Sequence, residues 1–324
     1  MRRGGGSPLS ALAGFLLLFM SAAFASCIYD YSDCPSENRE FRVVFDWDHS
    51  KQADVEGMTL FFYPMDEGGS IWRFDIPGRD GGSVELPFGQ YRMIAFNNDM
   101  PGIRLEDTES ASTIQAVMQR CDVDNDSVYG STGMLYNAIV RQIDVMPCGV
   151  RYSPADGQYV TAADGTVSCQ PDSLAIQFDV RLTGVKGTER LRSAQVILSG
   201  IRASVFLGDG HVSAIPAALA IRLDIDNERN ELSGRACGFD AYNRIGDDYR
   251  LTLLVTVADG SIMAKQIEIS PENLNVISQH SVVITVTDIE LPDDSRPDDI
   301  SGIEAGVDGW ELINIDVGPT IGNS

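Results

Sequence analysis

The chain reads Leu251-Thr-Leu-Leu-Val-Thr-Val257, then Ala-Asp-Gly-Ser261, then Ile262-Met-Ala-Lys-Gln-Ile-Glu-Ile269. Both long runs are rich in aliphatic and β-branched residues, which favour strands. Asp-Gly between two such runs is a strong signal for a tight hairpin turn, because both residues tolerate a positive φ. This stretch predicts two antiparallel strands joined by a hairpin.

Similar strand-like segments, bounded by Gly, Pro, Asn or Asp, follow one another along most of the chain. They lie at residues 41–47, 58–63, 71–76, 83–87, 90–96, 174–182, 194–198, 217–225, 231–239 and 281–289. Strands do not alternate with helices, so the parallel sheet of a nucleotide-binding fold is not indicated. Residues 112–120 are a helix candidate, although their Ser and Thr content makes a strand an equal alternative. The pattern predicts an all-β protein built from β-sandwiches.

The length of 324 residues is typical of about two domains. We place an N-terminal β-sandwich at residues 40–150, a loop-rich connector at 151–172 and a C-terminal β-sandwich at 173–291. Residues 292–324 begin as an acidic, proline-containing linker and end in a strand-like segment, Trp310–Val317. Three placements of that segment are open. It folds back on its own sheet, docks between the domains, or completes the sheet of a neighbouring molecule.

The N-terminus predicts the cellular location. A basic start and an apolar run at residues 9–24 have the pattern of a secretory signal peptide spanning residues 1–26. Phe24-Ala-Ser-Cys27 resembles a bacterial lipobox, with Phe24 where Leu is commonest. We therefore expect Cys27 to be lipidated, residues 27–39 to form a tether, and the acyl chains to hold the protein in the outer membrane. The alternative is ordinary secretion, with Cys27 in a disulfide.

The charge of the chain restricts its partners. Its 24 Lys plus Arg and 47 Asp plus Glu give a net charge of −23. Loss of residues 1–26, which carry two arginines and no acid, makes the charge −25. A chain this acidic repels phosphate backbones and anionic headgroups, which argues against nucleic-acid binding and against membrane attachment through a basic patch.

The six cysteines leave their pairing open. They are Cys27, Cys34, Cys121, Cys148, Cys169 and Cys237. Without a Cys-x-x-Cys, neither a zinc knuckle nor a dithiol redox motif is indicated. If Cys27 carries lipid, the odd number that remains allows at most two disulfides within the chain. A bond between Cys148 and Cys169 is one possibility, and buried thiols that pack as small hydrophobic groups are the alternative.

Residues that could carry chemistry are few. The sequence has no Gly-x-Ser-x-Gly elbow, His-Glu-x-x-His motif or Walker A loop. We expect the scattered His49, His211 and His280 to be structural. Acidic residues alternate in Asp122–Asp126, as calcium ligands do. The glycine and glutamate of an EF-hand are missing there, so a solvated turn is the simpler interpretation. We assign no catalytic residue, metal site or cofactor.

Several segments together resemble lipoproteins of the domain of unknown function 5119. The similar segments are residues 43–48, 57–64, 68–69, 82–87, 89–91, 95–98, 108–110, 237–239, 249–260, 310–311 and 315–317. Residues 122–172 match least. The resemblance implies a Bacteroidales-type, fimbrillin-like lipoprotein with two transthyretin-like β-sandwich domains, whose relatives build surface fimbriae by strand exchange. It implies no catalytic residues, and the only position that carries over is the lipidated Cys27.

Three functional hypotheses follow. The first is a lipid-anchored structural protein of the cell surface, a fimbrillin-like subunit or anchor without catalytic activity, with other fimbrial subunits as partners. The alternative is a surface lipoprotein that binds a glycan or host ligand, since tryptophans are good platforms for sugars. Trp47 and Trp72 lie in strand patterns, where core packing is expected, whereas Trp310 in the tail is harder to place in a core. An enzyme is the weakest alternative.

Overall fold

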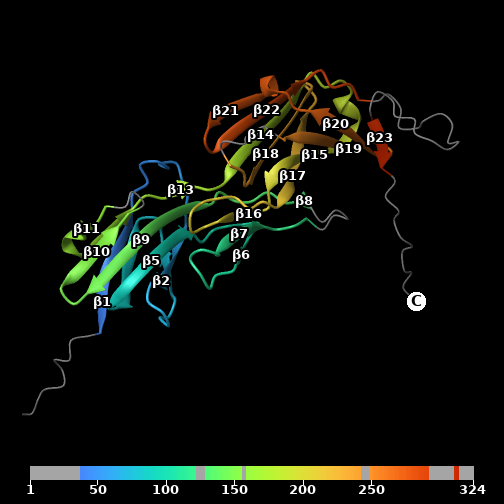
Figure 1. Ribbon diagram of the computed structural model, residues 1–324. Helices are drawn as coiled ribbons and strands as arrows, with labels where there is room; N and C mark the ends of the chain where they lie inside the picture. The colour runs from blue at the N-terminus through green and yellow to red at the C-terminus, as the bar shows by residue number, and fades with distance from the viewer. Residues whose placement is uncertain (1–36, 122–127, 155–157, 242–247, 292–309, 314–324) are drawn as a thin grey trace, which may run out of the picture. The chain divides into compact units, whose positions relative to one another are not determined.

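The computed structural model describes residues 37–121, 128–154, 158–241, 248–291 and 310–313, which are almost entirely strands and turns (Figure 1). Residues 38–324 belong to one compact unit and residues 1–37 to another. Within the described residues the only helices are short 3₁₀ turns such as Pro271–Asn273. None of the helices in this part of the chain could span a membrane. The predicted all-β class is confirmed.

Two sheets form the N-terminal half. The smaller has the order β12-β1-β4, and the larger has the order β11-β10-β9-β5-β2-β3 with β13 beside β9. Their strands are β1 (Asn38–Phe45), β2 (Gly57–Pro64), β3 (Trp72–Pro77), β4 (Gly81–Pro87), β5 (Gly89–Asn97), β9 (Tyr136–Met146), β10 (Gly149–Ser153), β11 (Val160–Thr161), β12 (Thr166–Cys169) and β13 (Asp172–Ser173). The two sheets share a hydrophobic core, as the layers of a sandwich do.

Strand β2 explains why its sequence is apolar at nearly every position. Met58, Leu60 and Phe62 belong to the core between the two N-terminal sheets. Phe61 and Tyr63 point to the opposite face and belong to the core that extends into the C-terminal half. A strand buried on both faces reads as a continuous hydrophobic run rather than an alternating one.

A long excursion leaves the N-terminal sheet between β5 and β9. It contains β6 (Ile103–Glu106), β7 (Gln115–Met118) and β8 (Val128–Tyr129). Strand β7 pairs with β6 and with β16 (Ser204–Phe206), and β8 pairs with β17 (Pro216–Asp226). Residues from the first half of the sequence therefore complete sheets of the second half.

Strand β7 settles the ambiguous segment at residues 112–120 in favour of a strand. Ala116 and Met118 are buried, whereas the alternate residues Gln115 and Val117 are partly exposed, so burial follows a period of two. The helix alternative is wrong there. Pairing with β6 on one side and β16 on the other stabilises the strand despite its weak local propensity.

The region expected to be a loop-rich connector, residues 151–172, is largely built into the N-terminal sheets. Strand β12 pairs in parallel with β1, and β11 pairs with β10. Val167 and Cys169 are buried and alternate with exposed Ser168, which is a short strand pattern that the surrounding turns obscure. The chain crosses into the second half only after β13, which pairs with β9 of the larger N-terminal sheet. The division into two domains stays a prediction.

The C-terminal half is one continuous sheet folded into two facing stretches. Their orders are β21-β22-β14-β18 and β17-β15-β19-β20-β23, joined where β17 pairs with β18. The remaining strands are β14 (Ile176–Thr183), β15 (Leu191–Arg202), β18 (Glu231–Gly238), β19 (Arg250–Val257), β20 (Ile262–Glu268), β21 (Leu274–Ser278), β22 (Ser281–Thr287) and β23 (Trp310–Ile313). The predicted hairpin at Asp259-Gly260 is confirmed, because β19 and β20 pair antiparallel around it.

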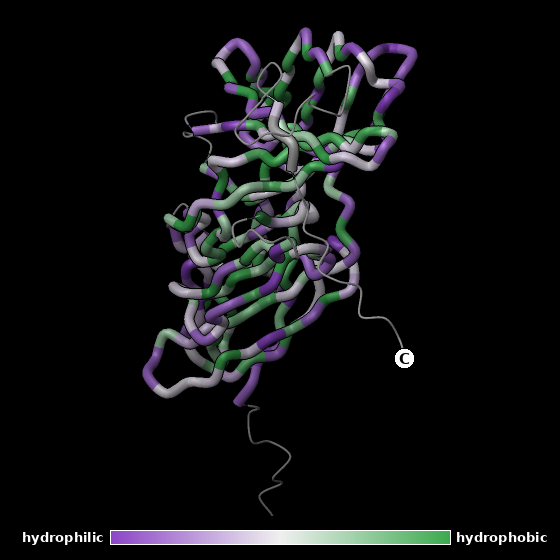
Figure 2. The backbone as a smooth tube through the Cα atoms, turned by 90° about the vertical axis from the view of Figure 1, so that its right-hand side faces the viewer, coloured by the Kyte–Doolittle hydropathy of each residue, from purple (hydrophilic) through white to green (hydrophobic). Residues whose placement is uncertain are grey.

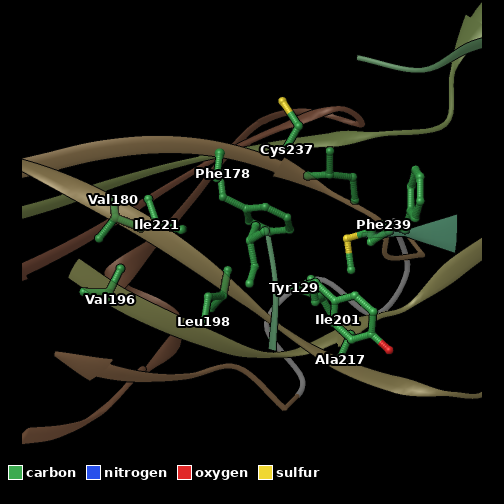
Figure 3. Close-up of a cluster of buried hydrophobic side chains, with 14 of the residues drawn as sticks. Tyr129, Phe178, Val180, Val196, Leu198, Ile201, Ala217, Ile221, Cys237 and Phe239 are labelled. Atoms are coloured by element: carbon green, nitrogen blue, oxygen red, sulfur yellow. The ribbon is translucent and has the colours of Figure 1, made fainter. Parts of the chain in front are cut away.

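Side chains from both stretches fill one core (Figure 3). Phe178 and Val180 of β14 face Val196 and Leu198 of β15, and all four are fully buried. Phe178 also meets the ring of Tyr249 edge-on, with centroids 5.8 Å apart. Hydrophobic positions recur along the strands and hydrophilic ones gather at many turns (Figure 2).

Candidate functional site

One edge of the C-terminal sheet is formed by β23, a short strand near the C-terminus. Strand β23 pairs antiparallel with β20, with Trp310 opposite Lys265. The Trp310 side chain is only 2% exposed, and its indole N–H donates to the carbonyl of Glu290 at 3.1 Å. The Lys265 ammonium lies 5.6 Å from the ring centroid. Of the three placements considered for this segment, the structure shows pairing within the chain, and Trp310 is a core residue after all.

The other edge of the same sheet is open among the described residues. Strand β21 pairs only with β22, and it carries no charged residue and no proline. Val276 is 42% exposed and Ile277 is 60% exposed. Soluble proteins normally protect an edge strand with charges, proline or a bulge, because its unpaired backbone groups attract other strands. A bulge near Val276 is the one such device here, and it leaves both apolar side chains in solvent.

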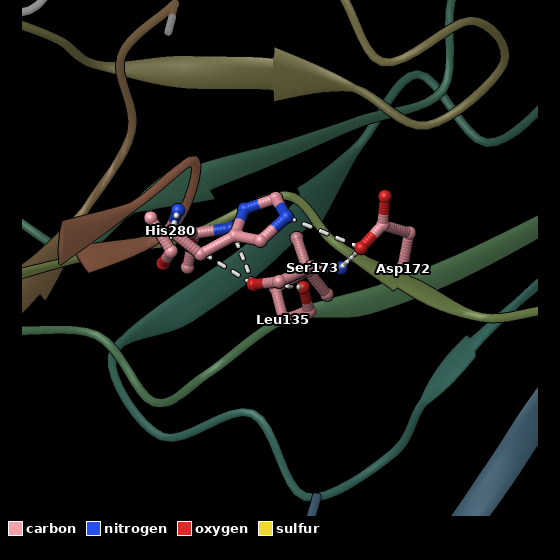
Figure 4. A network of polar contacts seen from close by, with 6 residues as sticks. Leu135, Asp172, Ser173 and His280 are labelled. Atoms are coloured by element: carbon pink, nitrogen blue, oxygen red, sulfur yellow. Dashed lines mark hydrogen bonds and ion pairs between the residues drawn. The ribbon is translucent and has the colours of Figure 1, made fainter. Parts of the chain in front are cut away.

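An open crevice of about 790 Å³ lies beside the β21–β22 turn. His280 at this turn meets Asp172 of β13, with 3.1 Å between Nε2 and Oδ1 (Figure 4). Asp172 Oδ1 also accepts the backbone N–H of Ser173. The bond from His280 is the main reason why the pKa of Asp172 lies below its ordinary value of 3.8. This contact links the larger N-terminal sheet to the C-terminal sheet.

Although Ser173, His280 and Asp172 lie together, they are not arranged as a nucleophile, base and orienting acid. The Ser173 side chain is buried, and its hydroxyl donates to the carbonyl of Ala175 at 2.9 Å. It also accepts the backbone N–H of Ala175. A catalytic serine needs its hydroxyl directed to the histidine and to the substrate. The described side chains of this cluster therefore form a structural hydrogen-bond network.

The Asp172–His280 contact predicts a pH dependence of stability. A carboxyl whose pKa is lowered on folding stabilises the protein above its unfolded pKa, and this contribution disappears as the pH falls through the folded pKa. Asp172→Asn should therefore lower the free energy of unfolding at pH 7 by less than about 1 kcal/mol, since the pair is partly solvated. The deficit should shrink toward pH 3. Urea unfolding of Asp172→Asn, His280→Gln and the double variant measures this, and additive losses at pH 7 would contradict it.

The cysteines in the described residues do not support the considered pairing. Cys148 is exposed in the β9–β10 turn and Cys169 is buried in β12, and both are unpaired thiols. Burial raises the pKa of the Cys169 thiol to about 12 and that of Cys237 to about 11. Thiols with such raised pKa values form little thiolate at neutral pH and react slowly. Cys27 and Cys34 lie outside the described residues.

The tryptophans differ from the sequence-based expectation in which of them are buried and which is exposed. Trp47 is buried as expected, and its indole N–H donates to the carbonyl of Arg79 at 2.8 Å. Trp72, expected in the core, is 36% exposed on the edge strand β3. It shares one face of β3 with Phe74 and Ile76, but β3 is the last strand of its sheet, so its ring is covered only in part. Trp72 is thus the most exposed tryptophan.

The other histidines singled out in the sequence form no metal or catalytic site among the described residues. His211 stacks on Phe206, with ring centroids 4.2 Å apart, and is exposed. His49 lines the crevice from an exposed loop. The Asp122–Asp126 segment, considered above as a calcium loop, lies outside the described residues. In the described part of the chain, no group of three or more His, Cys, Asp or Glu side chains could hold a metal ion.

The fold defines an all-β protein whose architecture recurs in solved structures. A crystal structure described as a "putative adhesin" from Bacteroides ovatus matches with a TM-score of 0.60 and 17% identity, covering 80% of this chain and 94% of that chain. A second "putative adhesin" from Bacteroides ovatus matches with a TM-score of 0.51 and 11% identity, covering 78% and 89%. At these identities the likeness concerns the fold alone.

Sequence comparison then identifies the family. The family model for the domain of unknown function DUF5119 matches residues 26–221, which is more than half of the chain, so the protein belongs to this family. Over 80 residues it is also 30% identical to a Bacteroides ovatus protein described as "Putative fimbrium anchoring subunit Fim4B". That match spans 25% of this chain and 24% of the relative, so only about a quarter of the curated relative is represented.

Proposed function

We propose that this protein is a lipid-anchored structural subunit of a surface fimbrium, held in the outer membrane by acyl chains on Cys27 and without a catalytic role. The partial match to a protein named as a fimbrium anchoring subunit supports this role. The lipobox-like Phe24-Ala-Ser-Cys27 supports the anchor. Cell-surface exposure follows from the same proposal, because a fimbrium is assembled outside the cell.

The open edge at β21 is the observation that carries the proposal. An incoming strand would pair with the outer backbone of β21 and extend the sheet at the end opposite to β23. Val276 and Ile277 are both exposed on this strand, so an added strand would cover apolar surface that is now in solvent. The partner is an uncharged, extended segment of another fimbrial subunit. An uncharged segment avoids the repulsion that a second copy of this acidic chain would cause.

A charge on the open edge tests this contact. Ile277→Lys should abolish co-purification of other fimbrial subunits with the protein, because pairing would bury an ammonium group against a strand. Ile215→Lys is the matched control, since Ile215 is 59% exposed but lies outside β21. Affinity purification from the native bacterium, with mass spectrometry of the bound subunits, gives the measurement. Equal recovery from both variants would rule out β21 as the contact.

The lipid anchor has its own test. After growth with an alkyne-bearing palmitate analogue, the wild-type protein should carry the label and be found in the outer-membrane fraction. Cys27→Ser should lose both, because no thiol remains for acylation at the lipobox. Cys34→Ser, a few residues further along the same segment, should keep both. Label retained in Cys27→Ser would contradict the assignment.

A further inference from the structure

Two parallel strand pairs have the same place in the topology of the two halves. In the first half β1, its first strand, pairs in parallel with β12, the last strand of the small sheet. In the second half β14, again the first strand, pairs in parallel with β22, the last strand before residue 292. Most other strand pairings in the described chain are antiparallel, so the parallel direction of these two pairs is a distinctive feature of the fold.

The first pair runs in register from Arg42 opposite Thr166 to Phe45 opposite Cys169. It continues past the strand ends, because the backbone N–H of Asp46 donates to the carbonyl of Cys169 at 2.8 Å. The Gln170 side-chain amide then donates to the Asp46 carboxylate at 2.9 Å. On its other side β1 pairs antiparallel with β4 over seven residues, so β1 is held along both edges.

The second pair is longer. Seven registered positions run from Gln177 opposite Ser281 to Thr183 opposite Thr287, with β14 and β22 side by side (Figure 1). The pairing extends further through Lys186, whose N–H donates to the carbonyl of Ile289 at 3.0 Å and whose carbonyl accepts the N–H of Leu291 at 3.2 Å. Both strands again have a second neighbour, β18 beside β14 and β21 beside β22.

The parallel direction determines how these pairs respond to tension. In each pair the first strand begins, and its parallel neighbour ends, at opposite ends of the pair. Tension applied between the start of the first strand and the end of its neighbour therefore pulls the paired strands at opposite ends and slides one along the other. Sliding requires the evenly spaced hydrogen bonds of a parallel ladder to break together. An antiparallel pair loaded at the same points would open from one end, one bond at a time.

We propose that the β1–β12 and β14–β22 pairs are two mechanical clamps in series, which resist tension between the N-terminal attachment and the end of β22. A protein that holds a fimbrium to a membrane is pulled from its lipidated end, so the source of the tension rests on the proposed function. The clamps themselves rest only on strand direction and register. Because forced unfolding is governed by the unfolding rate, they raise the barrier to unfolding along this one direction.

Optical tweezers test each clamp on the whole mature chain carrying Cys27→Ser. One DNA handle is attached at the N-terminus and the other at an azide-bearing amino acid. For the second clamp, this amino acid is placed at one of two positions. At Ser295, which follows β22, the handle loads the pair in shear. At exposed Gln279, which precedes β22, the handle opens the pair from one end. The unfolding force at equal loading rate should be several-fold higher with Ser295.

The first clamp has an equivalent comparison. Exposed Gln170 follows β12 and loads it in shear, whereas exposed Thr161 precedes it and opens the pair from one end. The higher force is expected at Gln170, and equal urea midpoints for all four labelled proteins would show that the difference is directional. Equal or reversed forces within either comparison overturn that clamp. These measurements use the isolated protein, so their failure is distinguishable from loss of lipidation or of partner binding.

Discussion

Trp310→Ala should lower the free energy of unfolding by about 3–5 kcal/mol, the usual cost of deleting a fully buried aromatic side chain. The indole is 2% exposed and lies in the core shared by both stretches of the C-terminal sheet. Its N–H bond to the Glu290 carbonyl also joins the edge strand β23 to the chain segment that follows β22. Urea unfolding of the mature chain, followed by circular dichroism so that the lost fluorophore does not matter, measures the change.

Trp72→Ala is the matched control for this prediction. Its side chain is 36% exposed at the edge of β3, so much less apolar surface returns to water and the loss should be clearly smaller. Trp310→Phe should recover part of the stability by refilling the space without the hydrogen bond. Deletion of residues 308–324 should destabilise at least as much as Trp310→Ala. A deletion variant that folds normally but fails to join oligomers would indicate instead that the terminal segment is donated to a neighbour.

Cutting the chain between its halves should unfold both parts. Residues 38–173 alone would expose the second face of β2, where Phe61 packs, together with the buried Ile114 of the excursion. Residues 174–324 alone would leave β16 without β7, and Leu207 without its hydrogen bonds to Ile114 and Asn137. Each fragment should bind the dye ANS and lack a cooperative urea transition, as loosely packed states do.

Co-expression provides the control for the cut. The two fragments expressed together should associate and regain one cooperative transition, because the surfaces that each exposes are complementary and apolar. Two fragments that each unfold cooperatively on their own would contradict this prediction. That result would support the independent sandwiches expected from the sequence at residues 40–150 and 173–291.

The crevice beside His280 could not have been predicted from the sequence, and neither could the open edge. Asp172 and His280 are 108 positions apart, and no periodicity links them. The strand that carries the exposed Val276 and Ile277 is not among the segments that the sequence pattern predicts. Their exposure follows from β21 being last in the sheet order, which is a property of the whole topology. Local pattern predicts that a segment is a strand, but not which strands lie beside it.

Local sequence patterns were enough to predict the all-β class, the hairpin at Asp259-Gly260 and most of the strand positions, because side-chain alternation and turn residues act over a few neighbours. They could not predict that β12 pairs with β1, that β7 pairs with β16 or that Trp310 is buried. These strands are short, with weak patterns of their own. Their conformation and partners are selected by long-range packing and backbone pairing, whose contributions appear only when distant segments meet.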